Sequence, residues 1–476
     1  MTTFYEFIKL KCKKYGTVYK KKMDKKAHHR GQWNSRIGFI LAASGSAVGL
    51  GAVWRFPYIT GQSGGAAFVL LYLGFLIIIA IPYMFCEFAL GRSTKKNPIG
   101  AVRQIRPKSF WITGGVLSVL VPVLICSYYA VIGSWALGYI FKMFVNQATQ
   151  FKEFVAAPQT MIPLFAVFLI LNVLIVYKGI EKGIERWAKV LMPMLFILML
   201  VLLVRSVTLQ GAAKGLQFYL EPDFSKINGA VVLAALGQAF FSLSLGMGVM
   251  ITYASYLSDD EDMVSSGAYV ALFTTLIALM MGMIVFSALF AFKEDPVCGP
   301  ALVFIILPEL FSKMFLGNIL GSAFFLLISV AAFTTIISFL EVAVAYLIDD
   351  AHKKRKYAVW VAAALIFILG IPSLLSEGAS ARLSSLSFFG GKSFLDMMDF
   401  TSGTIGILLS SLALCLFVGW GWGADKAVEE LQRGSVFFQR RFLGLPIKTA
   451  RVWQFFIRYI CPLAIIAVLL DALHIL

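Results

Sequence analysis

Residues 44–51 read SGSAVGLG and residues 242–248 read SLSLGMG, and each stretch interrupts a long apolar run. Both place glycines and hydroxyl side chains in the middle of an apolar helix, although glycine costs about 1 kcal/mol relative to alanine there. Close helix packing is one explanation, because small residues let backbones approach. A second explanation is that each helix is broken at this point. The matching positions in the two halves of the chain favour it, because paired interruptions indicate a transporter binding site.

The composition around these stretches is that of a membrane protein. Of the 476 residues, 59% are hydrophobic and 14% are charged, whereas soluble domains carry about 25% charged residues. This excludes a soluble enzyme, and it excludes a nucleic-acid-binding protein despite the net charge of +17. Eleven apolar runs approach or exceed the roughly 20 residues of a transmembrane helix. They are 37–58, 66–90, 112–141, 160–177, 187–205, 229–256, 265–292, 318–349, 357–375, 400–422 and 451–474.

The basic residues predict an orientation. Residues 1–36 hold eleven Lys or Arg and two acids, which predicts a cytoplasmic N-terminus because positive residues gather on that side of a membrane. With spans alternating from there, 31 of the 42 basic residues fall on the inner side. Five spans per half would make the halves inverted relative to each other. The expected division is a basic tail (1–35), repeat one (36–206), an extracellular connection (207–228), repeat two (229–424), and a cytoplasmic loop with span 11 (425–476).

Helix breaks in a membrane have a definite chemistry. Unwinding frees backbone N–H and C=O groups that lipid cannot satisfy. The N-terminus of a half-helix suits a carboxylate, and freed carbonyls suit Na⁺, so the breaks predict a site for a small zwitterion and a monovalent cation. An enzyme is not expected, because the histidines avoid the membrane interior, which argues against a His-based catalytic group or a buried metal site. They are His28, His29, His352 and His474.

Several further motifs, with the breaks, resemble the neurotransmitter:sodium symporter family. Their order and spacing are kept over nearly everything after residue 30, and eleven spans resemble the bacterial branch. The resemblance implies the all-α LeuT fold, with two inverted five-helix repeats (spans 1–5 and 6–10), unwound helices 1 and 6, and span 11. It implies sodium-coupled uptake of an amino acid by alternating access, in a bacterial inner membrane. The motifs include Trp33-Asn34-Ser35-Arg36, Trp54-Arg55-Phe56-Pro57-Tyr58, Glu87-Phe88-Ala89-Leu90-Gly91-Arg92, Lys182-Gly183-Ile184-Glu185-Arg186 and Asp399-Phe400 with Gly403-Thr404.

The resemblance also implies a substrate site. Gly49 stands where amine carriers of the family have an aspartate, which implies a substrate with its own carboxylate. Tyr129 matches the tyrosine that donates to this carboxylate, whereas Tyr128 is expected to be an interhelical tyrosine. The pocket is mostly apolar, so we expect a hydrophobic L-amino acid, bulky or aromatic side chains included. The expected site is Val48, Gly49, Leu50, Gly51, Ile125, Tyr129, Ile132, Phe241, Ser242, Ser244, Met247, Phe333, Ser338 and Phe339.

The ion sites follow the family unevenly. The set implied for one sodium ion is complete, and it comprises Gly45, Val48, Ala331, Thr334 and Thr335. The second set retains Ala47, Ser242 and Thr274, but Ala52 stands where the family has an asparagine. We therefore expect one Na⁺ per cycle. The chloride position matches Ala278, which offers no ligand, so we expect no chloride.

Two pairs of charged residues match the gates of the family. Arg55 and Asp399 match the outer pair, and Arg30 and Asp349 match the inner pair, with Trp33 packing and Tyr256 assisting.

Ala52 keeps open a sodium-independent or proton-linked exchanger, and a non-transporting amino-acid sensor is a further alternative. The retained gates argue against the sensor, which need not open to both sides. The expected partners are the amino acid and the lipid bilayer, without nucleic acid, for a monomer or weak dimer. Glu341 lies inside span eight, where an acid is a functional candidate by default; a structural role is expected first.

Overall fold

The computed structural model describes residues 31–145, 151–293, 302–312, 314–444 and 447–475, and within them the chain is a bundle of helices without a strand. Nine of the described helices are long and apolar enough to cross a membrane, and a bent helix pair makes a tenth candidate. A further apolar helix, α12, is shorter than a span, and we read it together with α13 as the eleventh. The helical membrane fold is therefore confirmed, and the count of eleven is consistent with it.

The first half of the chain begins with a broken helix and continues with long ones. Its elements are α2 (Arg36–Leu50), η1 (Gly51–Arg55), α3 (Phe56–Gln62), α4 (Ala66–Phe75), η2 (Leu76–Ala80), α5 (Ile81–Thr94), α6 (Pro98–Ile105), α7 (Ile112–Phe144), α8 (Phe151–Val155), α9 (Pro158–Tyr177), η3 (Ile180–Glu185), α10 (Arg186–Val207), α11 (Ala212–Leu220) and η4 (Phe224–Lys226).

The second half also begins with a broken helix. Its elements are α12 (Gly229–Ser242), α13 (Val249–Ala254), α14 (Met263–Ala291), η5 (Leu302–Ile306), α15 (Leu307–Ser312), α16 (Gly317–Asp349), α17 (Arg355–Leu375), α18 (Ala381–Ser384), η6 (Ser387–Phe389), α19 (Phe394–Met398), η7 (Asp399–Gly406), α20 (Ile407–Leu416), η8 (Phe417–Gly423), α21 (Ala424–Gln432), η9 (Phe437–Gln439), η10 (Phe442–Gly444), α22 (Thr449–Phe455), η11 (Phe456–Ile460) and α23 (Cys461–Ala472).

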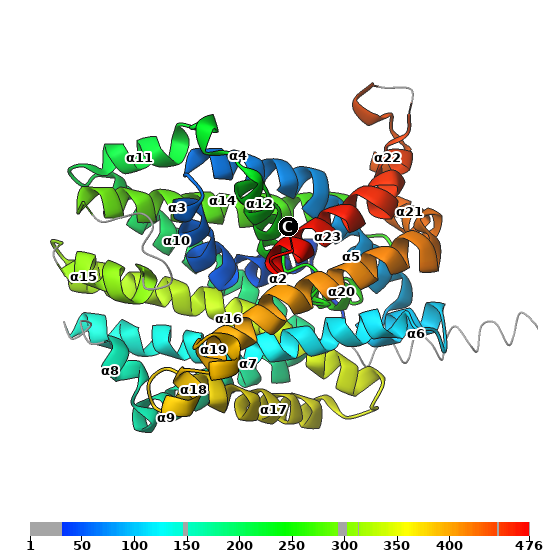
Figure 1. Ribbon diagram of the computed structural model, residues 1–476. Coiled ribbons are helices and arrows are strands. Elements are labelled where there is room, and N and C mark those ends of the chain that lie inside the picture. Colours follow the sequence, from blue (N-terminus) through cyan, green and yellow to red (C-terminus); the bar gives the residue numbers. More distant parts are fainter. Residues whose placement is uncertain (1–30, 146–150, 294–301, 313, 445–446, 476) are drawn as a thin grey trace, which may run out of the picture.

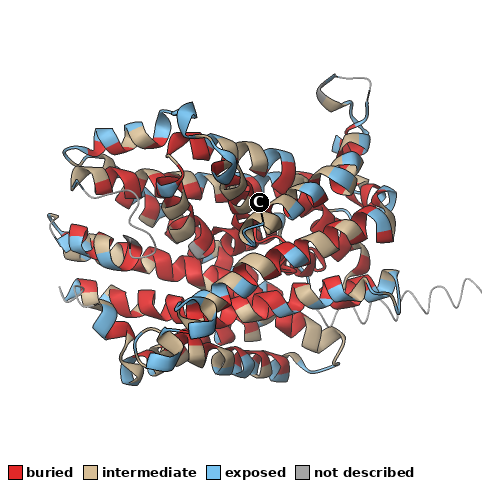
Figure 2. Cartoon of the chain, viewed as in Figure 1, coloured by how far each residue is buried: buried red, intermediate tan, exposed pale blue. Residues whose placement is uncertain are grey.

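Two helices form the centre of the bundle. In the most apolar window of α16, 83% of the residues are buried inside the protein, and in that of α7 78% are buried. In the last span, 449–472, the share is 28%. Figure 1 shows α16 and α7 running side by side through the middle of the molecule, and Figure 2 shows their buried surfaces. The breaks in α2 and between α12 and α13 therefore meet helices that have little contact with lipid.

Helix ends extend past the predicted apolar runs. The run 400–422 lies within one continuous helical stretch, Phe394–Gln432, and the run 187–205 lies within Ile180–Val207. A hydropathy criterion stops at charged side chains, but backbone hydrogen bonds continue beyond the membrane. The predicted boundaries were therefore too short at these ends.

The start of α14 is set by an aspartate cap. The Asp262 carboxylate accepts hydrogen bonds from the amides of Val264 and Ser265, both at 3.1 Å, and from the Ser265 hydroxyl at 2.6 Å. Burial, the largest single influence, would raise the pKa of Asp262, but the hydrogen bonds from Ser265 and Ser435 and the charge of Arg36 together outweigh it, so the pKa lies below its usual value. The cap therefore stabilises the fold at pH values above the pKa that Asp262 has in the unfolded chain.

We expect Asp262→Ala to lower the free energy of unfolding by about 1 kcal/mol at neutral pH, as is typical for loss of an N-cap. The difference from the unmodified chain should shrink as the pH falls through the lowered pKa of Asp262, because the protonated cap is a poorer acceptor. Thermal unfolding in detergent at several pH values measures this. Asp260→Ala, an exposed neighbour outside the cap, is the control, and an equal loss in both variants would contradict the cap.

Candidate functional site at the two helix breaks

The first break lies at Gly49. Its dihedral angles, φ −15° and ψ −164°, are not helical, and the helical segments on its two sides are bent by 49°. In an unbroken helix the carbonyl of Ser46 would accept from the amide of Leu50. Here that carbonyl accepts from the hydroxyls of Ser244 and Thr335, both at 3.1 Å. Side chains of α16 and of the second break therefore satisfy backbone that the first break frees.

The second break separates α12 from α13. Ser244, Gly246 and Gly248 all have positive φ, at 51°, 74° and 64°. A Cβ on Gly246 would lie 2.1 Å from the Ser411 hydroxyl oxygen and 2.7 Å from the carbonyl oxygen of Ile407. Glycine is therefore required at this position, both for its backbone conformation and for the close approach of α20.

Glu87 of α5 stabilises the second break, a role that was not predicted from the sequence. Its side chain is buried, and its Oε1 accepts a hydrogen bond from the amide of Gly246 at 2.7 Å. A carboxylate satisfies a backbone N–H that has lost its helical partner. The signal was present in the sequence, since an acid within an apolar run is a functional candidate by default.

Four of the five residues expected at the first sodium site come together where α2 meets α16. The Thr334 and Thr335 hydroxyls donate to the carbonyl of Ala331 in their own helix at 2.9 and 3.2 Å, and the Thr335 hydroxyl also donates to the Ser46 carbonyl of α2 at 3.1 Å. A Cβ on Gly45 would lie 3.1 Å from the Cβ of Thr334, so the backbones approach closely here. Val48 is fully buried on α2. The arrangement gathers hydroxyl and carbonyl oxygens without a charged group, which suits a monovalent cation.

The residues of the doubtful second sodium site are engaged elsewhere. The Thr274 hydroxyl donates to the carbonyl of Val270 in its own helix at 2.8 Å. The Ser242 hydroxyl accepts from the Gln238 side chain at 3.2 Å. Ala47 and Ala52 are buried and offer no side-chain oxygen, so only backbone and hydroxyl oxygens are present at this set.

The two neighbouring tyrosines of α7 have different surroundings. Tyr129 is buried, and its ring centroid lies 6.2 Å from that of Phe339. The Tyr128 hydroxyl donates to the Asp399 carboxylate at 2.8 Å. The contact of Tyr129 with substrate stays a prediction.

Four apolar residues expected in the pocket lie near Tyr129 or the breaks. Ile125 and Ile132 are buried on α7, four residues before and three after Tyr129, and so share its face of the helix. The ring of Phe241 lies against the backbone of Gly51, where an added Cβ would meet its Cε1 at 2.4 Å. Met247 is buried in the second break, and the side chain of Leu50 lies outside the described part.

Three other expected pocket residues have different contacts. The Ser338 hydroxyl lies 2.6 Å from that of Ser46 and 2.6 Å from the carbonyl oxygen of Thr335, and Ser244 bonds to the Ser46 carbonyl. These hydroxyls stabilise the break in this structure. The ring of Phe333 packs on Phe168 of α9, with centroids 4.3 Å apart.

The expected outer ion pair is not formed within the described residues. The Arg55 guanidinium lies over the ring of Phe241, 4.5 Å from its centroid. The Asp399 carboxylate accepts from Tyr128 instead. Each group therefore has another partner on a neighbouring helix in this structure, and the outer gate stays a prediction.

The inner gate is described only in part, because Arg30 lies outside the described residues. The amide of Trp33 donates to the carbonyl of Tyr256 at 3.3 Å, and its indole N–H donates to the carbonyl of Tyr253 at 2.8 Å. Asp349 accepts from the backbone and side chain of Asn97 at 2.9 and 3.0 Å. The start of the first span is thus tied to the second half of span six.

Glu341 lies at the same end as the inner gate. Its fully buried carboxylate accepts from the Tyr256 hydroxyl at 2.7 Å and pairs with the Arg355 guanidinium. These contacts favour the structural role expected first for Glu341, and that role stays a prediction.

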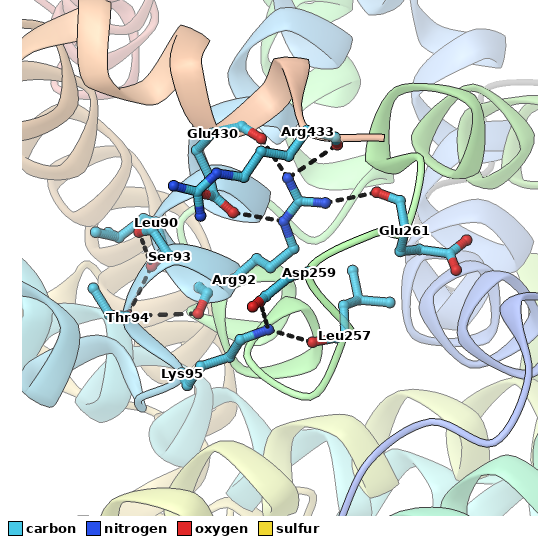
Figure 3. Close-up of polar contacts among 11 residues, drawn as sticks. Leu90, Arg92, Ser93, Thr94, Lys95, Leu257, Asp259, Glu261, Glu430 and Arg433 are labelled. Carbon is cyan, nitrogen blue, oxygen red and sulfur yellow. Dashed lines mark hydrogen bonds and ion pairs between the residues drawn. The ribbon is translucent and has the colours of Figure 1, made fainter. Parts of the chain in front are cut away.

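Arg92 joins three segments beside the inner gate (Figure 3). Its side chain is fully buried and pairs with the Glu430 carboxylate at 2.6 Å. It also donates to the carbonyls of Glu261, Glu430 and Arg433. One guanidinium therefore holds the end of α5, the connection before α14 and the end of α21 together.

Comparisons with known proteins agree with this arrangement. A family model described as the sodium:neurotransmitter symporter family matches residues 30–153 and 154–474. The sodium-dependent transporter YhdH of Bacillus subtilis is 38% identical over 454 residues, covering 94% of this chain and 98% of its own length. A sodium-dependent transporter of Haemophilus influenzae is 35% identical, covering 93% of this chain and 98% of its own length. The chain is also similar to the crystal structure of MhsT in complex with L-phenylalanine, with 40% sequence identity and a TM-score of 0.83. The match covers 93% of this chain and 100% of the MhsT chain.

Proposed function

Because the chain belongs to the sodium:neurotransmitter symporter family, a family of transporters and not of enzymes, we propose that it couples Na⁺ entry to uptake of a hydrophobic L-amino acid by alternating access. One observation carries the substrate class: Tyr129 is buried beside Phe339, and the ring of Phe241 lies against Gly51 at the first break. A substrate carboxylate placed there would meet a hydroxyl donor and the N-terminus of a half-helix. The rings of Phe241 and Phe339 favour an apolar side chain.

MhsT, a relative of known structure, was crystallised with L-phenylalanine. By analogy, we include bulky and aromatic side chains among the substrates of this chain.

The coupling ion would bind where α2 meets α16. Thr334 and Thr335 would offer their hydroxyl oxygens, and the carbonyls of Gly45, Val48 and Ala331 would complete the set. At the second set Ala52 adds no side-chain ligand, so we propose one Na⁺ per cycle. The absence of a ligand at Ala278 supports transport without chloride.

Uptake of a panel of labelled amino acids into proteoliposomes tests the proposal, with an inward Na⁺ gradient or with choline in place of Na⁺. We expect accumulation of hydrophobic amino acids that needs Na⁺, with a Hill coefficient near one, and no change when gluconate replaces chloride. A coefficient near two would restore the second sodium site. Uptake indifferent to Na⁺ would favour the exchanger, and binding without uptake would favour the sensor.

We expect Thr335→Val to raise the Na⁺ concentration for half-maximal uptake about tenfold to hundredfold, because an interaction with a charged group contributes about 1.5–3 kcal/mol. Valine keeps the shape of the side chain and removes only the hydroxyl. Thr94→Val is the control, because Thr94 is also buried and bonded to its own helix, at the carbonyl of Leu90, but lies outside the site. An unchanged Na⁺ requirement in Thr335→Val would contradict the assigned site.

For the membrane arrangement we propose the same orientation as the sequence predicts. The N-terminal tail would be cytoplasmic, in the inner membrane of a bacterium, with repeats over 36–206 and 229–424, as a monomer or weak dimer. Two bacterial relatives, each matched over nearly its whole length, support the bacterial membrane as the location. Labelling of single cysteines from each side of intact cells would test the orientation.

A further inference from the structure

A hollow of about 650 Å³ opens where α9 ends and α10 begins, beside the start of α2. Basic side chains dominate its lining. The charged residues are Lys178, Glu181, Lys182, Glu185, Arg186 and Lys189. The hollow lies outside the substrate and ion sites, and the transport proposal gives it no role.

One of its two carboxylates is already neutralised. Glu185 accepts from the amide of Asn34 and the hydroxyl of Ser35, both at 2.7 Å, and pairs with Lys189 at 2.7 Å, so its side chain is only 2% exposed. Within the described ranges, Lys178, Lys182 and Arg186 have no ion-pair partner. The rim of the hollow therefore carries an excess of exposed positive charge.

The same helix marks the position of the bilayer surface. Trp187 directly follows Arg186 and is 39% exposed, and Val190 and Ile197 farther along α10 are 54% and 60% exposed. An outward-facing apolar helix surface contacts lipid, and tryptophan gathers at the interface between lipid and water. The basic hollow therefore lies at the depth of the lipid headgroups, with the acyl-chain region directly beside it.

A further cation lies next to the hollow. The Lys356 ammonium is 5.7 Å from the centroid of the Tyr177 ring, and Tyr177 lines the hollow. Lys178 just after α9, Arg186 of α10 and Lys356 of α17 thus gather at the hollow.

We propose that this hollow binds the headgroup of an anionic phospholipid. Basic pockets between membrane helices on the cytoplasmic side recognise such headgroups, and Arg186 can donate two hydrogen bonds to one phosphate. The apolar surface from Trp187 onward would hold the acyl chains, which a free phosphate lacks. The tail of the chain is a poor occupant, because residues 1–36 hold eleven basic residues and two acids.

Native mass spectrometry of the full chain in detergent tests this inference, with phosphatidylglycerol or phosphatidylcholine added. We expect retained phosphatidylglycerol and little phosphatidylcholine, and we expect Lys182→Gln with Arg186→Gln to weaken phosphatidylglycerol binding about thirtyfold. Lys426→Gln with Arg451→Gln is the matched control, since it removes two exposed basic residues elsewhere on the same predicted side. It should bind as the unmodified chain does.

Each other outcome has a clear meaning. Equal binding by both double variants would overturn the proposal. Displacement of the lipid by soluble glycerol phosphate at equal concentration would show that the hollow takes a free phosphate and would also overturn it. If the double variant at 182 and 186 does not fold, Lys178→Gln provides the test, because Lys178 is exposed and forms no ion pair with the described residues. It should weaken binding severalfold.

Discussion

Gly49→Ala should reduce Na⁺-driven uptake at least tenfold. A Cβ at this position would lie 2.1 Å from the hydroxyl oxygen and 3.1 Å from the Cβ of Thr335, so Thr335 or the break must move. Either movement separates the Thr335 hydroxyl from the Ser46 carbonyl and from the proposed sodium site. Overpacking typically costs about 1–3 kcal/mol, so the variant should still fold. Uptake and thermal unfolding, measured on one preparation, separate the two effects.

Two further variants show whether the clash with Thr335 is the cause. Adding Thr335→Ala to Gly49→Ala removes the clashing atom, so stability should recover while uptake stays low, because the hydroxyl is lost. Gly74→Ala is the control, since an added Cβ there meets nothing within 4 Å. Normal uptake by Gly49→Ala would show that the break tolerates a side chain, and the proposed site would then be wrong.

Arg92→Met should lower the free energy of unfolding by about 3–5 kcal/mol, as expected when one partner of a buried ion pair is removed. The guanidinium is fully buried, and its partner Glu430 is 4% exposed. Methionine also leaves the carbonyls of Glu261 and Arg433 without this donor. Thermal unfolding in detergent measures the change. Arg92→Lys should recover only part of it, because lysine lacks the planar fork that reaches several acceptors.

The matched control for this prediction is Arg103→Met. Arg103 pairs with Asp350, but its side chain is 51% exposed, and exposed pairs contribute about 0–1 kcal/mol. Equal losses for the two variants would show that the Arg92 contacts add nothing beyond an ordinary surface pair.

The sequence could predict the helices and the positions of the breaks, because both depend on local chemistry. A bilayer requires apolar runs of a given length, and SGSAVGLG and SLSLGMG concentrate the residues that permit unwinding. The resemblance to the family, and not local chemistry, singled out Tyr129 and the pair Thr334 and Thr335. The polar residues proved harder. Ser338 was expected to contact substrate, but its hydroxyl lies against Ser46.

The sequence alone therefore determined that this is a membrane protein of broken helices, since the length, apolarity and glycine content of a segment are properties of that segment. Only the tertiary structure decided which polar groups pair. Arg92 and Glu430 are 338 residues apart, Glu87 and Gly246 are 159 apart, and the Arg55–Asp399 contact is not formed. The physical reason is that each such group has several partners of suitable chemistry along the chain, and helix packing selects among them by bringing one within hydrogen-bonding distance.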